Sequence, residues 1–258
     1  EDYTPIFLYT MFNNISKIIC SKSSKGHANE IIEMNSTYGD LLFIFHSLID
    51  KYVMDAVRFH IKKLVNLDKP ELLFLIWNFL MRFTETNEFT IFIASHFPVK
   101  PISRIIFTPY HPVTSIIFYS ITKTLKSNDS NSIDHCCNFI YSLFKPLEQD
   151  EVKNAMRYRV AYAFYPILEI LTNYFETLDI SQRVRLLPPI LFLLGYSPQQ
   201  LTRYHFIANT SNLQTPFVTF LNLTIDTIIQ HGKSENETIE TLSYLFEELT
   251  KRILQILN

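Results

Sequence analysis

Glycine is scarce in this sequence. The chain of 258 residues contains 4 glycines, whereas an average usage of about 7% would give roughly 18. Hairpin turns, Rossmann turns and phosphate-binding loops need glycine for a positive φ or for close approach of the backbone. Neither G-x-x-x-x-G-K-[ST] nor G-x-G-x-x-G occurs. The shortage therefore argues against folds rich in β-hairpins and against the common modes of nucleotide-dependent catalysis.

Cysteine is also rare, and its pattern does not suit disulfides. The three cysteines are Cys20, Cys136 and Cys137, and an odd count with an adjacent pair is not a disulfide framework. We therefore expect an intracellular protein, cytoplasmic or nuclear. His135 completes a local cluster with the pair, but successive helical residues point about 100° apart and cannot all reach one metal. We expect no metal or other cofactor, and cysteines that are buried on a helix.

No charge of one sign and no long apolar run stands out. The 23 basic and 25 acidic residues give a net charge of -2, which provides no electrostatic footprint for duplex nucleic acid or an anionic membrane. The longest apolar stretch, from Leu72 to Met81, is interrupted by Asn78 and is far shorter than the ~20 residues of a membrane span. We expect neither a nucleic-acid ligand nor a membrane span.

Catalytic motifs are absent from the sequence as well. There is no G-x-S-x-G nucleophile motif, and none of the 8 histidines belongs to an H-E-x-x-H pair. The carboxylates are scattered in first helical turns and on polar faces, where capping and solvation explain them. We expect no catalytic residue, and the protein is predicted not to be an enzyme.

What the sequence has is helical periodicity. Hydrophobic residues make up 47% of the chain, and they recur at intervals of three and four residues. Capping motifs start helices at Asp68-Lys69-Pro70-Glu71, Ser197-Pro198-Gln199-Gln200 and Ser234-Glu235-Asn236-Glu237. Pro166 is expected to kink or split the seventh helix near Tyr165. The sequence predicts an all-α fold with helices at about 5–20, 40–67, 69–86, 88–97, 112–127, 131–145, 148–177, 181–194, 197–208, 214–231 and 234–257.

Two segments interrupt this pattern and suggest a division of the chain. The polar segment 21–39 is expected to be a loop, and the stretch 98–111 is a proline-rich connection. We therefore predict an N-terminal helical subdomain over 1–97 and a C-terminal helical-repeat subdomain over 112–258. Trp77 lies in a segment that is apolar on nearly all sides, so we expect it in the core.

Paired helices begin near residues 70, 112, 148, 181 and 216, at spacings between 33 and 42 residues. This period is typical of helical-hairpin arrays, although no residue signature repeats. In this respect the chain resembles the HEAT/armadillo class of α-helical repeats. The resemblance implies an irregular α-solenoid of stacked helical hairpins with about 10–12 helices.

Arginine and tyrosine gather in the C-terminal half. Arginine beside tyrosine is typical of interface hot spots and of sites for acidic or phosphorylated peptides. The alternative is a set of ion pairs with Asp150, Glu151, Asp179 and Glu169. The predicted partner-binding residues are Arg157, Tyr158, Arg159, Arg183, Arg185, Arg203 and Tyr204.

Two functions are favoured at this point, and an enzyme with a site assembled from dispersed His, Arg and Glu is a third alternative. The first is a non-enzymatic helical scaffold or adaptor that mediates protein–protein interaction within a larger intracellular assembly, with a protein carrying an acidic or phosphorylated segment as the partner. The second is an all-α regulatory domain of a transcriptional regulator that binds an apolar small ligand, a lipid or sterol, in an aromatic-lined pocket. Aromatic residues make up 14% of the chain, and both functions use them.

Overall fold

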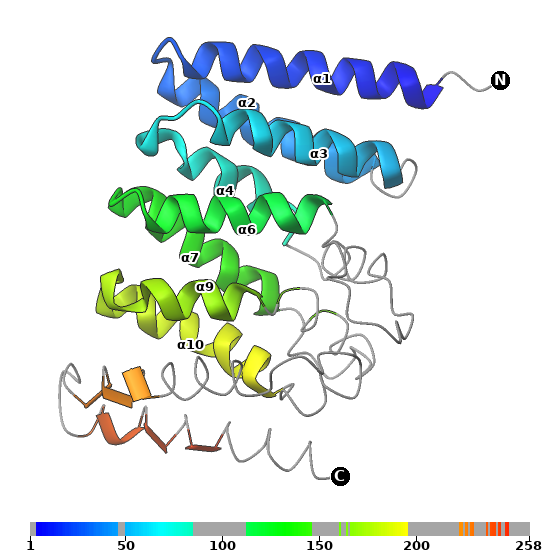
Figure 1. Cartoon of the computed structure of the whole chain (residues 1–258). Coiled ribbons are helices and arrows are strands. Elements are labelled where there is room, and N and C mark those ends of the chain that lie inside the picture. The colour runs from blue at the N-terminus through cyan, green and yellow to red at the C-terminus, as the bar shows by residue number, and fades with distance from the viewer. Residues whose placement is uncertain are drawn as a thin grey trace, which may run out of the picture. The chain divides into compact units, whose positions relative to one another are not determined.

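The computed structural model describes residues 4–45, 50–84, 112–145, 160, 164 and 166–195, together with separate residues between 222 and 247. Helices make up 87% of the described residues, and none of these residues is in a strand, which confirms the all-α prediction (Figure 1). The elements are α1 (Thr4–Ser23), α2 (Ala28–Phe45), α3 (Asp50–Val65), the 3-10 helix η1 (Pro70–Leu72), α4 (Phe74–Met81), α6 (Pro112–Leu125), α7 (Ser130–Phe144), α9 (Pro166–Tyr174), the 3-10 helix η3 (Phe175–Thr177) and α10 (Ile180–Gly195).

Several helices lie where the periodicity predicted them. α6 and α7 correspond to the expected helices 112–127 and 131–145, and α10 corresponds to 181–194. The described part of α9 begins at Pro166. Phe164 is also helical and Tyr165 lies outside the described residues, so the kink or split expected at Pro166 stays a prediction. The predictions for 88–97, 98–111 and 197–208 and the capping motifs at Ser197 and Ser234 lie outside the described residues.

The expected loop over 21–39 is wrong. Helix α2 occupies most of this segment and buries Ile31, Tyr38 and Leu42 on one face. The intervening polar residues lie mostly on the exposed face, which gave the segment the composition of a loop. The turn itself is short and contains Gly26 at a φ of 86°, a conformation that favours glycine. The single helix expected over 40–67 is likewise two helices, the end of α2 and α3.

The capping motif at Asp68 does not work as the sequence suggested. Asp68 has a φ of 52°, whereas a capping residue at a helix start has an extended backbone. Its carboxylate instead accepts a hydrogen bond from Lys123 Nζ at 3.0 Å. The start of α4 is capped from another helix, because the Phe74 N–H donates to Ser132 Oγ of α7 at 3.0 Å. The Asp68 motif therefore marks a turn that α6 and α7 hold in place.

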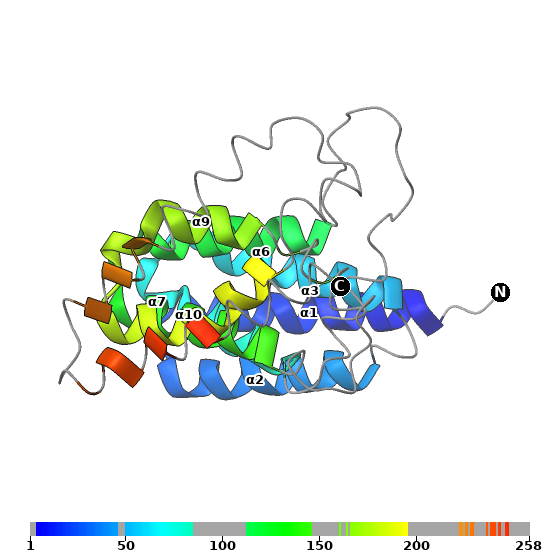
Figure 2. The same ribbon diagram turned by 90° about the horizontal axis from the view of Figure 1, so that it is seen from below.

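The chain divides into two compact units. Unit 1 comprises residues 1–90 and 110–142, and unit 2 comprises residues 91–109 and 143–258. In unit 1, α1 packs on α3 and α3 packs on α6, while α2 packs on α4 in a second layer (Figures 1 and 2). The division predicted at 98–111 falls outside the described residues, and the described helices on its two sides, α3, α4 and α6, belong to unit 1.

The core of unit 1 contains Trp77, as predicted. Its side chain is 0% exposed, its Nε1–H donates to Thr124 Oγ1 at 3.1 Å, and its ring centroid lies 5.4 Å from that of Phe139. Cys136 and Cys137 are buried on α7, as expected for structural residues. Trp77 thus ties α4 to both α6 and α7 through one hydrogen bond and one ring contact.

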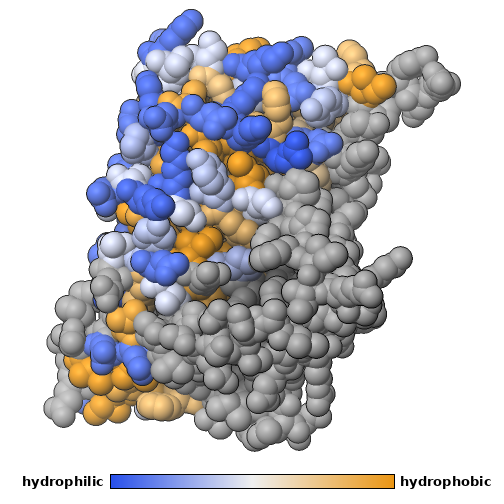
Figure 3. Space-filling view, viewed as in Figure 1, coloured by the Kyte–Doolittle hydropathy of each residue, from blue (hydrophilic) through white to orange (hydrophobic). Residues whose placement is uncertain are grey.

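On the face shown in Figure 3, hydrophilic residues alternate with hydrophobic ones over the described helices. The first turns of α1 expose Ile6 and Phe7, whose accessible fractions are 57% and 68%. None of the described helices is long and apolar enough to cross a lipid bilayer.

Candidate functional site

The arginine and tyrosine group predicted from the sequence is described only in part. Arg157, Tyr158, Arg159, Arg203 and Tyr204 lie outside the described residues. Arg183 and Arg185 lie on the first turns of α10 and are half-buried. The structure therefore bears on two of the seven predicted residues.

Arg183 holds the turn that precedes its own helix. Its Nε–H donates to the carbonyl oxygen of Leu178 at 2.8 Å. Its guanidinium carbon lies 5.1 Å from the ring centroid of Phe175, within the range of a cation–π contact. These contacts give Arg183 a structural role in the connection between η3 and α10.

Arg185 contributes to the electrostatics of the same turn. Asp179 accepts a hydrogen bond from the Gln182 N–H at 2.9 Å and one from the Ser181 hydroxyl at 2.8 Å, while its own N–H donates to Gln182 Oε1 at 3.0 Å. Burial raises the pKa of Asp179, but these hydrogen bonds and the charge of Arg185 outweigh it and lower the pKa below its ordinary value. Asp179 and Gln182 form a reciprocal capping box, which the sequence analysis did not identify. A binding role for the arginine group stays a prediction.

An open groove lies on the surface of unit 1. It has a volume of about 450 Å³ and runs along α2, with α4 supplying its other side. Among the described lining residues, Ile32 is the one with an apolar side chain. The lining residues are Asn29, Ile32, Glu33, Ser36, Thr37, Asp40, Asn78 and Arg82.

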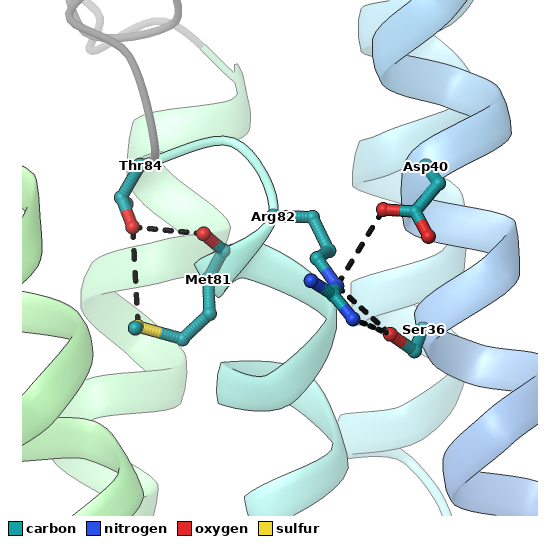
Figure 4. A network of polar contacts seen from close by, with 5 residues as sticks. All are labelled: Ser36, Asp40, Met81, Arg82 and Thr84. Atoms are coloured by element: carbon teal, nitrogen blue, oxygen red, sulfur yellow. Dashed lines mark hydrogen bonds and ion pairs between the residues drawn. The ribbon is translucent and has the colours of Figure 1, made fainter.

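Arg82 joins the two helices that form the groove (Figure 4). Its Nε–H and Nη2–H groups donate to Ser36 Oγ at 2.8 and 2.6 Å, and its Nε lies 3.5 Å from Asp40 Oδ1. Gly39 allows this close approach, because a Cβ at that position would lie 3.1 Å from the Phe79 carbonyl oxygen and 3.2 Å from Arg82 Cγ. The guanidinium is thereby fixed at one side of the groove.

The groove is anchored on a buried polar network beneath α2. Asn35 Nδ2 donates to the Leu75 carbonyl oxygen at 2.8 Å, so its Oδ1 is the acceptor for His60 Nε2 at 2.8 Å. His60 Nδ1 then accepts from the Ser16 hydroxyl at 2.8 Å. Burial lowers the pKa of His60 to about 3. A neutral imidazole therefore links α1, α2, α3 and α4, since these residues belong to the four helices in turn.

The cluster of His135, Cys136 and Cys137 has the contacts of packed residues. Burial raises the pKa of the Cys136 thiol well above its ordinary value and lowers the pKa of His135, whose ring lies 5.6 Å from that of Phe74. Within the part of the chain that the structure describes, no three His, Cys, Asp or Glu side chains are grouped so that they could hold a metal ion.

Sequence reasoning missed the groove because it assigned the residues of α2 to a loop. The spacing of Ile31, Asn35, Tyr38 and Leu42 is helical and is the signal that could have identified α2. What the groove offers chemically is a set of hydrogen-bonding groups with two carboxylates and one guanidinium, an arrangement suited to a polar ligand. Comparisons with protein-family models, with curated proteins and with solved structures found no match to this chain.

Proposed function

We propose that this protein is a non-enzymatic helical scaffold, an irregular solenoid of the HEAT/armadillo kind, that binds another protein. The observation that carries the proposal is the alternation of helices in unit 1, where α1, α3 and α6 pack in one row and α2 packs on α4 in another. Consecutive helical hairpins that stack in this way leave an extended surface on each row, and such surfaces bind proteins.

The groove along α2 supports a binding role for the outer surface of the second row. It lies across two consecutive hairpins, because α2 and α4 are separated in the chain by α3. Its floor is fixed from below by the hydrogen bond from Asn35 to Leu75. A pre-formed surface of this kind loses little conformational entropy when a partner binds.

The contacts of the aromatic side chains favour the scaffold over the apolar-ligand alternative for unit 1. The ring centroid of Phe79 lies 5.7 Å from that of Tyr38 and 4.6 Å from that of His60. Trp77 packs on Phe139 in the same core. These rings pack directly against one another and stabilise the core. A lipid or sterol site would instead need a cavity between such rings.

The proposal includes an intracellular assembly as the setting. Cys20, Cys136 and Cys137 are free thiols, and the last two are buried. Free thiols are typical of proteins in a reducing intracellular compartment. An acidic or phosphorylated segment remains the proposed ligand for the arginine group of unit 2. This part of the proposal rests on composition alone.

Affinity purification of the tagged chain after chemical crosslinking in cells, followed by mass spectrometry, tests the proposal. We expect a protein that co-purifies reproducibly and forms a stoichiometric complex with the purified chain on size-exclusion chromatography with light scattering. Organic extraction of the same purified chain provides the comparison. A monomer that captures no protein and releases a stoichiometric lipid would contradict the scaffold and support the apolar-ligand function.

A further inference from the structure

The charge of the α2 groove points to the kind of segment that it binds. Helix α2 carries three acidic residues, Glu30, Glu33 and Asp40, and no basic residue. Glu30 is paired with Lys22 at 3.0 Å, outside the groove. Glu33 and Asp40 line the groove. Because they are seven residues apart, they lie two turns apart on the same side of the helix, separated by about 10 Å along its axis.

Among the described residues that line the groove, Arg82 is the one cation, and it neutralises these carboxylates only in part. Arg82 directs two N–H groups to Ser36 and lies 3.5 Å from Asp40. The side chains of Arg82 and Asp40 are 40% and 52% exposed, and an ion pair as exposed as this stabilises little. Within the described part of the chain, no ion pair involves Glu33. The groove therefore presents two carboxylates against one guanidinium.

We propose that this groove binds a segment of the partner protein that carries lysine or arginine side chains, which Glu33 and Asp40 receive. The inference rests on the proposed function and adds the chemistry of the partner to it. A lysine or arginine of the bound segment would neutralise the second carboxylate of the groove, since Arg82 supplies one positive charge against two negative ones. Asn29, Thr37 and the neighbouring amide of Asn78 add hydrogen-bonding groups without charge.

Other occupants fit the lining less well. An acidic segment or a nucleic-acid backbone would place negative charge beside Glu33, which is unfavourable. Two carboxylates two turns apart present two separate charges rather than one chelating centre for a metal ion. An apolar segment would find Ile32 as the one apolar side chain among the described lining residues. The proposed segment is thus distinct from the acidic one expected at Arg183 and Arg185, which belong to unit 2.

Selection from a phage-displayed library of random dodecapeptides against the immobilised 258-residue chain tests the inference without requiring the partner to be identified first. Selected peptides are synthesised and their affinities are measured by fluorescence anisotropy. We expect peptides enriched in Lys and Arg. Their affinity for the Glu33→Gln/Asp40→Asn variant should be lower than for the wild type by a factor of about five or more. This difference should shrink in 1 M salt, where the Debye length falls to about 3 Å.

The matched control is Glu71→Gln/Asp226→Asn, which removes the same charge from exposed positions outside the groove. It should bind the selected peptides as the wild type does, and circular dichroism should give all three proteins similar melting temperatures. Selection of no peptide enriched in Lys or Arg, or equal affinity of basic peptides for the groove variant and the wild type, would overturn the inference. Because none of these outcomes concerns co-purification of a partner, the proposed function would still stand or fall on its own experiment.

Discussion

The buried imidazole of His60 makes a quantitative prediction about stability and pH. His60 is 0% exposed, and both ring nitrogens are hydrogen-bonded, to Ser16 and to Asn35. Neither partner is charged, and the positive charge of Lys63 also disfavours protonation. The pKa of His60 is therefore about 3 in the folded protein, against an ordinary value of 6.5.

The sign of the effect follows from which state binds the proton. As the pH falls below 6.5 the unfolded chain protonates this histidine, whereas the folded protein does not do so until about pH 3. The stabilisation is therefore complete above pH 6.5 and is lost as the pH falls between these two values. The loss amounts to about 1.4 kcal/mol per pH unit, so this one group should lower the free energy of unfolding by about 2.5 kcal/mol between roughly pH 7 and pH 4.5.

Urea unfolding followed by circular dichroism at the two pH values measures this loss. The test variant is His60→Gln, which keeps an amide in the network but does not titrate. It is expected to be less stable than the wild type at pH 7 and to lose about 2.5 kcal/mol less on acidification. His27→Gln is the matched control, because His27 is exposed in the turn before α2. If wild type and His60→Gln lose the same free energy between the two pH values, the assignment of a buried neutral imidazole is refuted.

Three further substitutions test the packing of unit 1 by chemical denaturation. Trp77→Ala should cost about 3–5 kcal/mol, and the native wild type should show blue-shifted tryptophan fluorescence, since the ring is fully buried; emission at the wavelength of exposed tryptophan would contradict this. Gly39→Val should cost about 1–3 kcal/mol because its Cβ would already lie 3.1 Å from the backbone oxygen of Phe79, and an unchanged stability would mean that α2 and α4 can separate. Ser132→Ala removes the cap of α4 and should cost about 1 kcal/mol, with faster hydrogen exchange of the Phe74 amide as the specific readout.

Local features of the sequence predicted much of the fold. The periodicity of apolar residues located α6, α7 and α10. The segment around Trp77 is apolar on nearly all sides, which predicted its place in the core. These predictions succeeded because the deciding information lies within about one helix of each residue.

Contacts between distant residues account for what the sequence did not predict. Asp68 has the sequence of a capping residue, but Lys123 binds it from a position 55 residues away. The polar residues of α2 suggested a loop, whereas Asn35 among them binds the backbone of Leu75, 40 residues away. The groove depends on the same pairing of α2 with α4. Two helices that meet only in the folded chain leave no local signal of the surface that they form together.

Hydrogen–deuterium exchange of the chain with and without its purified partner tests most directly whether the protein is a scaffold that binds through the α2 groove. We predict slower exchange on binding in the segments 29–40 and 78–82, which line the groove. The Glu33→Gln/Asp40→Asn variant should lose this protection at the same partner concentration. Protection confined to the segments around Arg157 and Arg203 would move the binding surface to the arginine group, and an exchange pattern that the partner leaves unchanged throughout the chain would contradict the scaffold function.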